Sequence, residues 1–316
     1  MKIIVVGAGS FGTAVANSLK KENAIFLFTR DGLNVARINA TRRNETYFPN
    51  KVLSKKIKAT NNADHFIDVD VVLICIPSHA VINFFNSVSV SPDALILNGA
   101  KGFGKGTELI PQALSSFLPN PIYSFKGPSF ADEFIYELPT AFTIAGRSSE
   151  KFQFISSLFR KDLVVLDFSN DMRGVETLSI IKNIYAIIVG IVDASFNSAN
   201  VRFMIFTKAL NEIKKIIELL SIPIETLFKY GGIGDFGLTA LNDLSRNRTL
   251  GLLIGKGFFG DDIGNNVVLE GVRAVEKVLG VLPKESHHDL PLLLKLSYLI
   301  KKKVSVSTFV REVIYN

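Results

Sequence analysis

The first half of the chain alternates short apolar runs with segments of helical character. Residues 69–77 are almost continuously hydrophobic, which is typical of a strand buried on both faces of a parallel sheet. Strands that alternate with helices in this way predict βαβ units and a mostly parallel sheet. We predict a helix over residues 13–20 and strands over residues 2–6, 24–29, 69–77, 95–98, 122–125, 140–145 and 163–168.

The pattern changes at about residue 171, where apolar residues begin to recur at helical spacing and few strand signals remain. We therefore expect an α/β domain over residues 1–170 and a mainly α-helical domain over residues 171–316. The expected helices of the second domain cover residues 176–192, 204–220, 238–255, 267–279 and 290–303.

Composition narrows the class of protein. The 316 residues are 47% hydrophobic and 21% charged, which fits an ordinary globular chain. No run reaches the ~18 apolar residues of a transmembrane helix, so we expect a cytoplasmic protein. The net charge of +7 comes without a long basic block, so nucleic-acid binding is not expected. The single cysteine, Cys75, excludes an internal disulfide and a cysteine-cluster zinc site, and no metal is expected.

A glycine pattern follows the first predicted strand. Gly7-x-Gly9-x-x-Gly12 lies directly after a β-branched run and opens the first predicted helix. In such a turn the first glycine permits the tight bend, the second lets the backbone approach a pyrophosphate, and the third lets helix and strand pack closely. The helix N-terminus then offers N–H groups to the phosphates. This context predicts a Rossmann-type dinucleotide-binding domain over residues 1–170.

The end of the second predicted strand bears on the choice of cofactor. An acidic residue there would accept a hydrogen bond from the ribose of NAD, whereas a guanidinium suits the 2′-phosphate of NADP. This chain has Arg30 at that place and Asp31 directly after it. The sequence favours NADPH and leaves NADH open.

Polar residues in three parts of the sequence are candidates for binding a substrate or taking part in a reaction. Lys101 follows the strand at 95–98, and Ser129 lies in the Gly-Pro loop after the strand at 122–125. Loops at these strand ends line the ligand crevice of open α/β sheets, although each loop alone is also an ordinary turn. Lys182 and Asn183 lie inside a strongly apolar helix, where burying them unpaired would be costly. A desolvated lysine facing a polar cleft can donate a proton near neutral pH.

The third place is the segment around Asp235 and Ser245-Arg246-Asn247. An arginine can bind a phosphate with two hydrogen bonds, and serine and asparagine add more. The alternative for this segment is a helix start with capping residues. We expect His79 and the pair His287-His288 to be surface or loop residues, with His79 near the cofactor, and Cys75 to be inert in a buried strand.

Taken together in order, these segments resemble bacterial-type NAD(P)-dependent glycerol-3-phosphate dehydrogenases, over roughly residues 3 to 275. The matching pieces are the glycine turn, Asn44-x-x-Tyr47-Phe48-Pro49, Pro77-Ser78, Lys101-Gly102, Gly127-Pro128-Ser129-Phe130-Ala131, Lys182-Asn183, residues 231–235, Ser245-Arg246-Asn247, Gly251 and Leu269-Glu270-Gly271. The resemblance implies the reduction of dihydroxyacetone phosphate to sn-glycerol 3-phosphate, which feeds glycerophospholipid synthesis.

The resemblance also implies roles for single residues. Lys182 resembles the catalytic lysine, Lys101 the lysine that contacts both substrate and cofactor, and Asp235 is expected to hold Lys182. The implied substrate-binding positions are Lys101, Gly127, Ser129, Lys182, Asp235, Ser245, Arg246 and Asn247. The implied cofactor-binding positions are Gly7, Gly9, Ser10, Phe11, Gly12, Arg30, Lys101, Ala131, Arg246, Val268 and Glu270. We expect Lys101 and Lys182 to meet across one crevice between the two domains.

The chain departs from the family pattern at several positions. Ser198-Ala199-Asn200 stands where Gly-Asp-Asn is usual, Phe203 and Met204 replace small residues, and Phe11 replaces a common tryptophan. These changes put the packing of the helical domain in question. A dehydrogenase of another hydroxy acid and a non-catalytic NADPH-binding protein remain alternatives, and a homodimer remains open.

Overall fold

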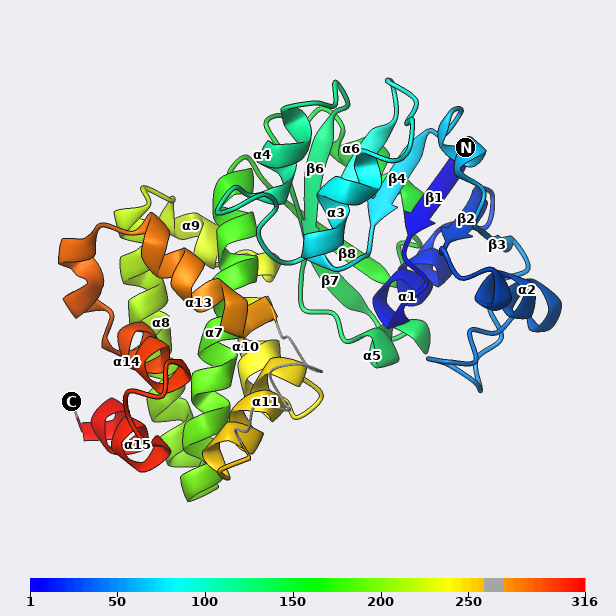
Figure 1. Cartoon of the computed structure of the whole chain (residues 1–316). Helices are drawn as coiled ribbons and strands as arrows, with labels where there is room; N and C mark the ends of the chain where they lie inside the picture. The colour runs from blue at the N-terminus through cyan, green and yellow to red at the C-terminus, as the bar shows by residue number, and fades with distance from the viewer. Residues whose placement is uncertain (259–269, 316) are drawn as a thin grey trace. The chain divides into compact units, whose positions relative to one another are not determined.

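The computed structural model describes residues 1–258 and 270–315, and the chain divides into two units, Met1–Met172 and Arg173–Asn316. The expected boundary lay between residues 170 and 171. The first unit is built on one eight-stranded sheet (Figure 1). Its strands are β1 (Lys2–Val6), β2 (Ala24–Phe28), β3 (Ile57–Thr60), β4 (Val71–Ile74), β5 (Leu95–Asn98), β6 (Ile122–Lys126), β7 (Thr140–Ala145) and β8 (Val164–Ser169).

The strand order explains why ligands would bind at one edge of the sheet. The order is β3-β2-β1-β4-β5-β6-β7-β8, and the first six of these strands run parallel to one another. Only the pairing of β6 with β7 is antiparallel in the described sheet. The chain order reverses on either side of β1, between β2 and β4, and such a switch point opens a crevice at the carboxyl ends of the strands. The predicted mostly parallel sheet is confirmed.

Strand β3 was not predicted. Its residues Ile57–Thr60 follow a lysine-rich stretch, and Lys58 lies within the strand itself. Because β3 ends the sheet order, it is an edge strand, where lysine side chains can reach water and discourage pairing with another chain. These lysines also interrupt the apolar pattern by which a strand is recognised in the sequence, so β3 was missed.

Both faces of the sheet are covered by helices. In β1, Ile3 and Val5 pack into one apolar cluster, whereas Ile4 and Val6 pack into another. This alternation is the period of two that a strand imposes, and it accounts for the unbroken hydrophobic runs. The helices are α1 (Ser10–Ser18), α2 (Gly32–Thr41), α3 (Ser78–Phe85), α4 (Ile110–Ser115), α5 (Ala131–Ile135) and α6 (Phe152–Leu158), with a short 3-10 turn at Ala63–Phe66.

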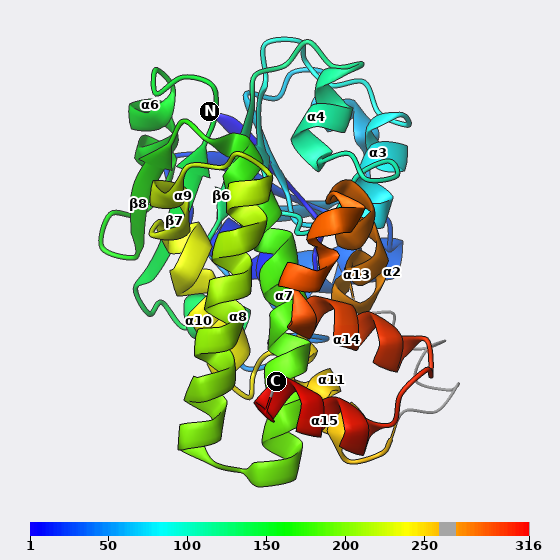
Figure 2. The ribbon, with the colours of Figure 1, turned by 90° about the vertical axis from the view of Figure 1, so that its left-hand side faces the viewer.

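The second unit is helical, and its two longest helices lie side by side (Figure 2). Its described helices are α7 (Met172–Phe196), α8 (Ala199–Leu219), α9 (Ile224–Leu227), α10 (Asp235–Leu241), α11 (Arg246–Gly255), α13 (Glu270–Val281), α14 (Pro291–Ile300) and α15 (Val306–Tyr315), with short helical turns at Tyr230–Gly234 and Lys284–Asp289. The expected single helix over 238–255 is wrong. It is two helices, because the Asn242 and Ser245 side chains accept backbone N–H groups and start a new helix.

Helix α7 forms the core of this unit. By length and composition alone it could cross a membrane, and among the described helices it alone passes that test. However, 94% of its most apolar window is buried, as in the core helix of a folded domain. Glycines let α11 approach it closely, since a Cβ on Gly251 would lie 2.2 Å from the Ile187 carbonyl oxygen.

A buried carboxylate joins three helices of the second unit. Glu212 of α8 accepts hydrogen bonds from the Tyr185 hydroxyl of α7 at 2.9 Å and from the backbone N–H groups of Leu292 and Leu293 at 2.5 and 3.2 Å. These two N–H groups belong to the first turn of α14. Burial raises the pKa of Glu212 to about 7, although the three donors favour the charged form and partly offset the rise.

This carboxyl group should make stability depend on pH. A group whose pKa is raised on folding contributes its full stabilisation when the pH is below its pKa in the unfolded state, here 4.5. This contribution is lost as the pH rises through the folded-state pKa of about 7. We expect the free energy of unfolding of the wild type, relative to Glu212→Gln, to fall by about 3 kcal/mol or less between pH 5 and pH 8. Urea unfolding at several pH values measures it.

The control is Glu218→Gln, which changes an exposed carboxylate on the same helix, and its difference from the wild type should stay nearly constant. A pH-independent difference for Glu212→Gln would show that the carboxyl group keeps an ordinary pKa.

Candidate active site

The glycine turn of the first unit has room for a phosphate. Gly7 has φ of +112°, and a Cβ on Gly12 would lie only 1.9 Å from the Gly7 carbonyl oxygen, so the turn requires glycine at both positions. Gly9 differs, because within the described residues a Cβ there would meet no heavy atom within 4 Å. Helix α1 begins at Ser10, directly after this open space. Open space against a helix N-terminus fits the pyrophosphate of a dinucleotide.

Asn44 supports this turn from outside it. Its buried side-chain amide donates to the Ala8 carbonyl oxygen and to Thr13 Oγ1, both at 2.8 Å. One carboxamide thus fixes a residue inside the turn and a residue of the helix that follows. In the sequence, Asn44 belongs to the motif Asn44-x-x-Tyr47-Phe48-Pro49, but nothing in that motif indicates this role.

Arg30, Lys101 and Ser129 follow β2, β5 and β6 at the carboxyl edge of the sheet. Because these strands are parallel members of one sheet, their ends meet at the same edge. Arg30 is exposed, whereas Lys101 and Ser129 are half-buried. Asp31, the neighbour that complicated the choice of cofactor, caps α2 by accepting the N–H groups of Leu33 and Asn34 at 3.0 and 3.2 Å. Its carboxylate is therefore engaged locally, which favours Arg30 as the residue available to a ribose phosphate.

In the second unit, the lysine in the apolar helix is tied to two side chains. Lys182 Nζ donates to Asp235 Oδ1 at 2.6 Å and to Thr239 Oγ1 at 2.8 Å. Lys182 is 3% exposed and Asp235 is 1% exposed. The predicted contact between Lys182 and Asp235 is present. Thr239 was missed, although it lies four residues after Asp235 and therefore on the same face of α10.

The three residues Ser245, Arg246 and Asn247 differ in their surroundings at the start of α11. Ser245 caps α11 by accepting the Arg248 N–H at 3.3 Å, so the capping alternative is correct for this residue. Arg246 is exposed in the first turn. Asn247 Oδ1 is buried and, among the described residues, has no hydrogen-bond partner. An acceptor in this state fits a hydroxyl group supplied by a ligand.

Two predicted cofactor residues cannot be placed. Val268 lies outside the described residues, and Glu270 begins α13 but its side chain lies outside what is described. The expectation that Lys101 and Lys182 meet stays a prediction, because they belong to different units.

A second buried ion pair was missed by sequence reasoning. Arg248 Nη2 donates to Asp193 Oδ2 at 2.5 Å, and Arg248 Nε donates to Asp243 Oδ1 at 3.0 Å. Asp193 of α7 also accepts two hydrogen bonds from Arg202 of α8. The cluster fixes the start of α11, and with it Arg246 and Asn247, against α7.

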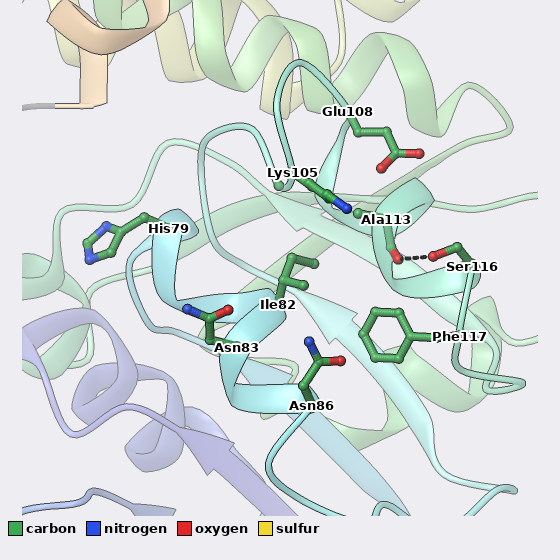
Figure 3. A pocket seen from close by; sticks show the side chains of 10 residues that line it. His79, Ile82, Asn83, Asn86, Lys105, Glu108, Ala113, Ser116 and Phe117 are labelled. Carbon is green, nitrogen blue, oxygen red and sulfur yellow. Dashed lines mark hydrogen bonds between the residues drawn. The ribbon is translucent and has the colours of Figure 1, made fainter.

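The remaining candidates lie elsewhere. His79 is exposed on α3 and lines a hollow of about 510 Å³, with Asn83 and Lys105 among its other lining residues (Figure 3). Of the predicted site residues that the structure describes, none lines this hollow. His288 is exposed, and half-buried His287 contacts the Leu279 carbonyl oxygen at 3.0 Å. Cys75 follows β4, which ends at Ile74, so its predicted place within a buried strand is wrong. Burial still raises the pKa of its thiol, which agrees with an inert cysteine.

The departures from the family pattern do not disturb the described core. Phe203 is 57% exposed and Met204 36% exposed on α8, so their bulk lies at the surface of the unit. Ser198 caps α8. Phe11 lies with its ring centre 6.5 Å from that of Phe125 and packs against the sheet's apolar cluster.

A mostly parallel sheet with an open glycine turn, followed by a helical unit with a buried lysine, is the arrangement of two-domain, NAD(P)-binding dehydrogenases. Models of the NAD-dependent glycerol-3-phosphate dehydrogenase family match the chain, the N-terminal model over residues 2–152 and the C-terminal model over residues 171–311. The chain belongs to this family.

Individual relatives agree with the assignment. A Clostridium botulinum protein named glycerol-3-phosphate dehydrogenase (NAD(P)+) is 30% identical, and the match covers 99% of this chain and 92% of that protein. The crystal structure of glycerol-3-phosphate dehydrogenase from Coxiella burnetii is 27% identical with a TM-score of 0.88, covering 100% of this chain and 99% of that one. A ketopantoate reductase from Ralstonia eutropha has a TM-score of 0.59 at 14% identity, covering 96% of this chain and 99% of that one, which shows a shared fold alone.

Proposed function

We propose that this chain is a cytoplasmic enzyme that reduces dihydroxyacetone phosphate to sn-glycerol 3-phosphate with NADPH and so supplies glycerophospholipid synthesis. The observation that carries the proposal is the buried Lys182 ammonium, fixed by Asp235 and Thr239, in a chain of this family. A buried cation held by two acceptors has the properties needed to stabilise charge on a reacting carbonyl oxygen.

The chemistry divides between the cofactor and the protein. The nicotinamide, when bound, supplies the hydride that forms the new C–H bond at C2 of the ketone. Lys182 donates a proton to the carbonyl oxygen as the negative charge develops on it. Asp235 and Thr239 keep the Lys182 Nζ in one position, and the Asp235 carboxylate stabilises its charged form. Lys101, which we assign to both substrate and cofactor contacts, adds positive potential near the same oxygen.

The phosphate of the substrate is assigned to the start of α11. Arg246 binds it through its guanidinium, and Ser245 can donate its hydroxyl proton while it accepts the Arg248 N–H. Asn247 Oδ1, buried and without a partner among the described residues, accepts a substrate hydroxyl. Gly127 and Ser129 of the first unit complete the substrate contacts. Binding the phosphate away from C2 orients the reacting carbon.

The cofactor is assigned to the carboxyl edge of the first unit. Its pyrophosphate lies at Gly7, Gly9, Ser10, Phe11 and Gly12, and further contacts come from Arg30, Lys101, Ala131, Arg246, Val268 and Glu270. The open space beside Gly9 supports this assignment.

The decisive experiment measures NADPH and NADH oxidation with dihydroxyacetone phosphate beside unphosphorylated dihydroxyacetone. We expect oxidation with the phosphorylated ketone, faster with NADPH. A 2-keto acid serves as a third substrate, and oxidation with it but not with dihydroxyacetone phosphate would favour a hydroxy-acid dehydrogenase of this fold. NADPH binding without any turnover would favour a non-catalytic protein. Light scattering would show whether the chain forms a homodimer.

Arg30 should set the preference for NADPH. A charge-assisted bidentate contact is worth about 1.5–3 kcal/mol, so Arg30→Ala should lower kcat/KM for NADPH by about 10–100-fold. The value for NADH should change by less than about threefold. The matched control is Arg37→Ala, which removes one exposed charge from the adjacent α2. Equal losses with both cofactors, or an equal loss in the control, would count against a 2′-phosphate contact.

A further inference from the structure

Besides Lys182 of the second unit, the chain has a buried lysine in the first unit, Lys126. The proposed reaction gives Lys126 no role. Lys126 is the last residue of β6 and is 0% exposed. Its Nζ donates to the Asn98 carbonyl oxygen at 3.1 Å and also to the Ala100 carbonyl oxygen. Burying an ammonium is costly unless hydrogen bonds compensate, so losing either of these two contacts would be energetically unfavourable.

The two carbonyl groups belong to the segment that joins β5 to Lys101. In a trans peptide the C=O and the following N–H point in opposite directions. The first peptide shows this arrangement, since the Asn98 carbonyl meets Lys126 while the Gly99 N–H donates to the Ile74 carbonyl oxygen at 2.9 Å. The Ala100 carbonyl also accepts a hydrogen bond from Lys126, so the N–H of Lys101, which belongs to the same peptide, points to the opposite side. The orientation of this peptide plane fixes the position of the Lys101 Cα, from which its side chain extends.

Asn98 holds the same segment from a second direction. Its side-chain Oδ1 accepts the Ala100 N–H at 3.2 Å, which closes a local turn. Lys126 itself directly precedes Gly127, where the other candidate substrate loop begins. One side chain therefore connects the ends of β5 and β6 at the carboxyl edge of the sheet.

We propose that Lys126 is a positioning residue, which sets the orientation of Lys101 by holding the Asn98 and Ala100 carbonyl groups. This inference rests on the proposed function, in which Lys101 contacts substrate and cofactor. A displacement of about 1 Å at such a group can reduce turnover by about 10²-fold. The sequence conceals the role, because Lys126 lies in a lysine-glycine turn of ordinary composition.

The test is Lys126→Met, which keeps the length of the side chain and removes the ammonium. We expect kcat/KM for dihydroxyacetone phosphate to fall by about 10–100-fold in the wild-type background and by less than twofold in a Lys101→Ala background. Such non-additivity shows that Lys126 acts through Lys101. If Lys126 had a purely structural role, Lys126→Met would lower kcat/KM by the same factor in both backgrounds, and that result would overturn the proposal.

The matched control is Asn120→Leu. The Asn120 amide, before β6, holds the Ser91, Pro92 and Ala94 carbonyl groups at the opposite end of β5. This variant should lose stability comparably but keep kcat/KM within twofold. If it loses as much activity as Lys126→Met, the effect is general destabilisation and the proposal is wrong.

Hydrogen exchange of the amides of Gly99 to Lys101 gives a readout that does not depend on turnover. Exchange should accelerate at least tenfold in Lys126→Met and stay unchanged in Asn120→Leu. If the wild type reduces no dihydroxyacetone phosphate, the proposed function fails while this comparison still tests the contact. If Lys126→Met does not fold, Lys126→Gln, which shortens the side chain and removes the ammonium charge from the two carbonyl groups, should give the kinetic loss and the faster exchange. Unchanged values in that variant would overturn the proposal.

Discussion

Replacing Lys182 by methionine should lower kcat for dihydroxyacetone phosphate reduction by about 10²–10⁴-fold, the range typical of removing a general acid. Methionine keeps the length of the side chain but supplies neither a proton nor a positive charge to the carbonyl oxygen. KM should change much less, because the interaction strengthens as charge develops in the transition state. Steady-state kinetics at saturating NADPH measure both constants.

The single variant also leaves Asp235 buried without this cation, and breaking a buried pair typically destabilises a protein by about 3–5 kcal/mol. Lys182→Met/Asp235→Asn removes both charges and should recover stability without recovering kcat. Glu212→Gln is the matched control, since it alters another buried carboxyl group of the same unit and should retain turnover. A folded Lys182→Met protein with near-normal kcat would remove Lys182 from the role of proton donor.

The strands of the first unit were predictable because burial on both faces leaves an unmistakable run of apolar residues. Residues 2–6 and 95–98 coincide with β1 and β5. Strand β3 was missed because an edge strand can carry lysines. The division between α10 and α11 was missed for a different reason, since apolar spacing continues across a break that the Asn242 and Ser245 side chains stabilise locally.

Apart from the glycine turn, the residues alone indicated the candidate site only where burying a residue type is energetically costly. Lys182 in an apolar helix met that condition, and the structure supplies the partners that burial requires. Thr239 and Lys126 did not, because each lies in an ordinary local sequence and gains its partner only through a contact distant along the chain. Residue spacing carries no signal for such contacts, which only the fold brings together.

Replacing Arg246 by alanine should raise KM for dihydroxyacetone phosphate by about 10–100-fold, because a charge-assisted hydrogen-bonded contact contributes about 1.5–3 kcal/mol. The effect on kcat should be smaller, since a phosphate contact made equally in the ground state and the transition state is uniform binding. The matched control is Lys256→Ala, which removes an exposed charge just past the other end of α11 and should leave KM within twofold.

The unphosphorylated ketone separates a phosphate contact from a general loss of the site. Dihydroxyacetone has no group for Arg246 to bind, so its low kcat/KM should be nearly the same in the wild type and in Arg246→Ala. The preference for the phosphorylated substrate should therefore shrink by the same factor by which KM rises. If both ketones lose activity equally at saturating NADPH, Arg246 acts only through its cofactor contact or the shape of the site, and the phosphate must be bound by other residues.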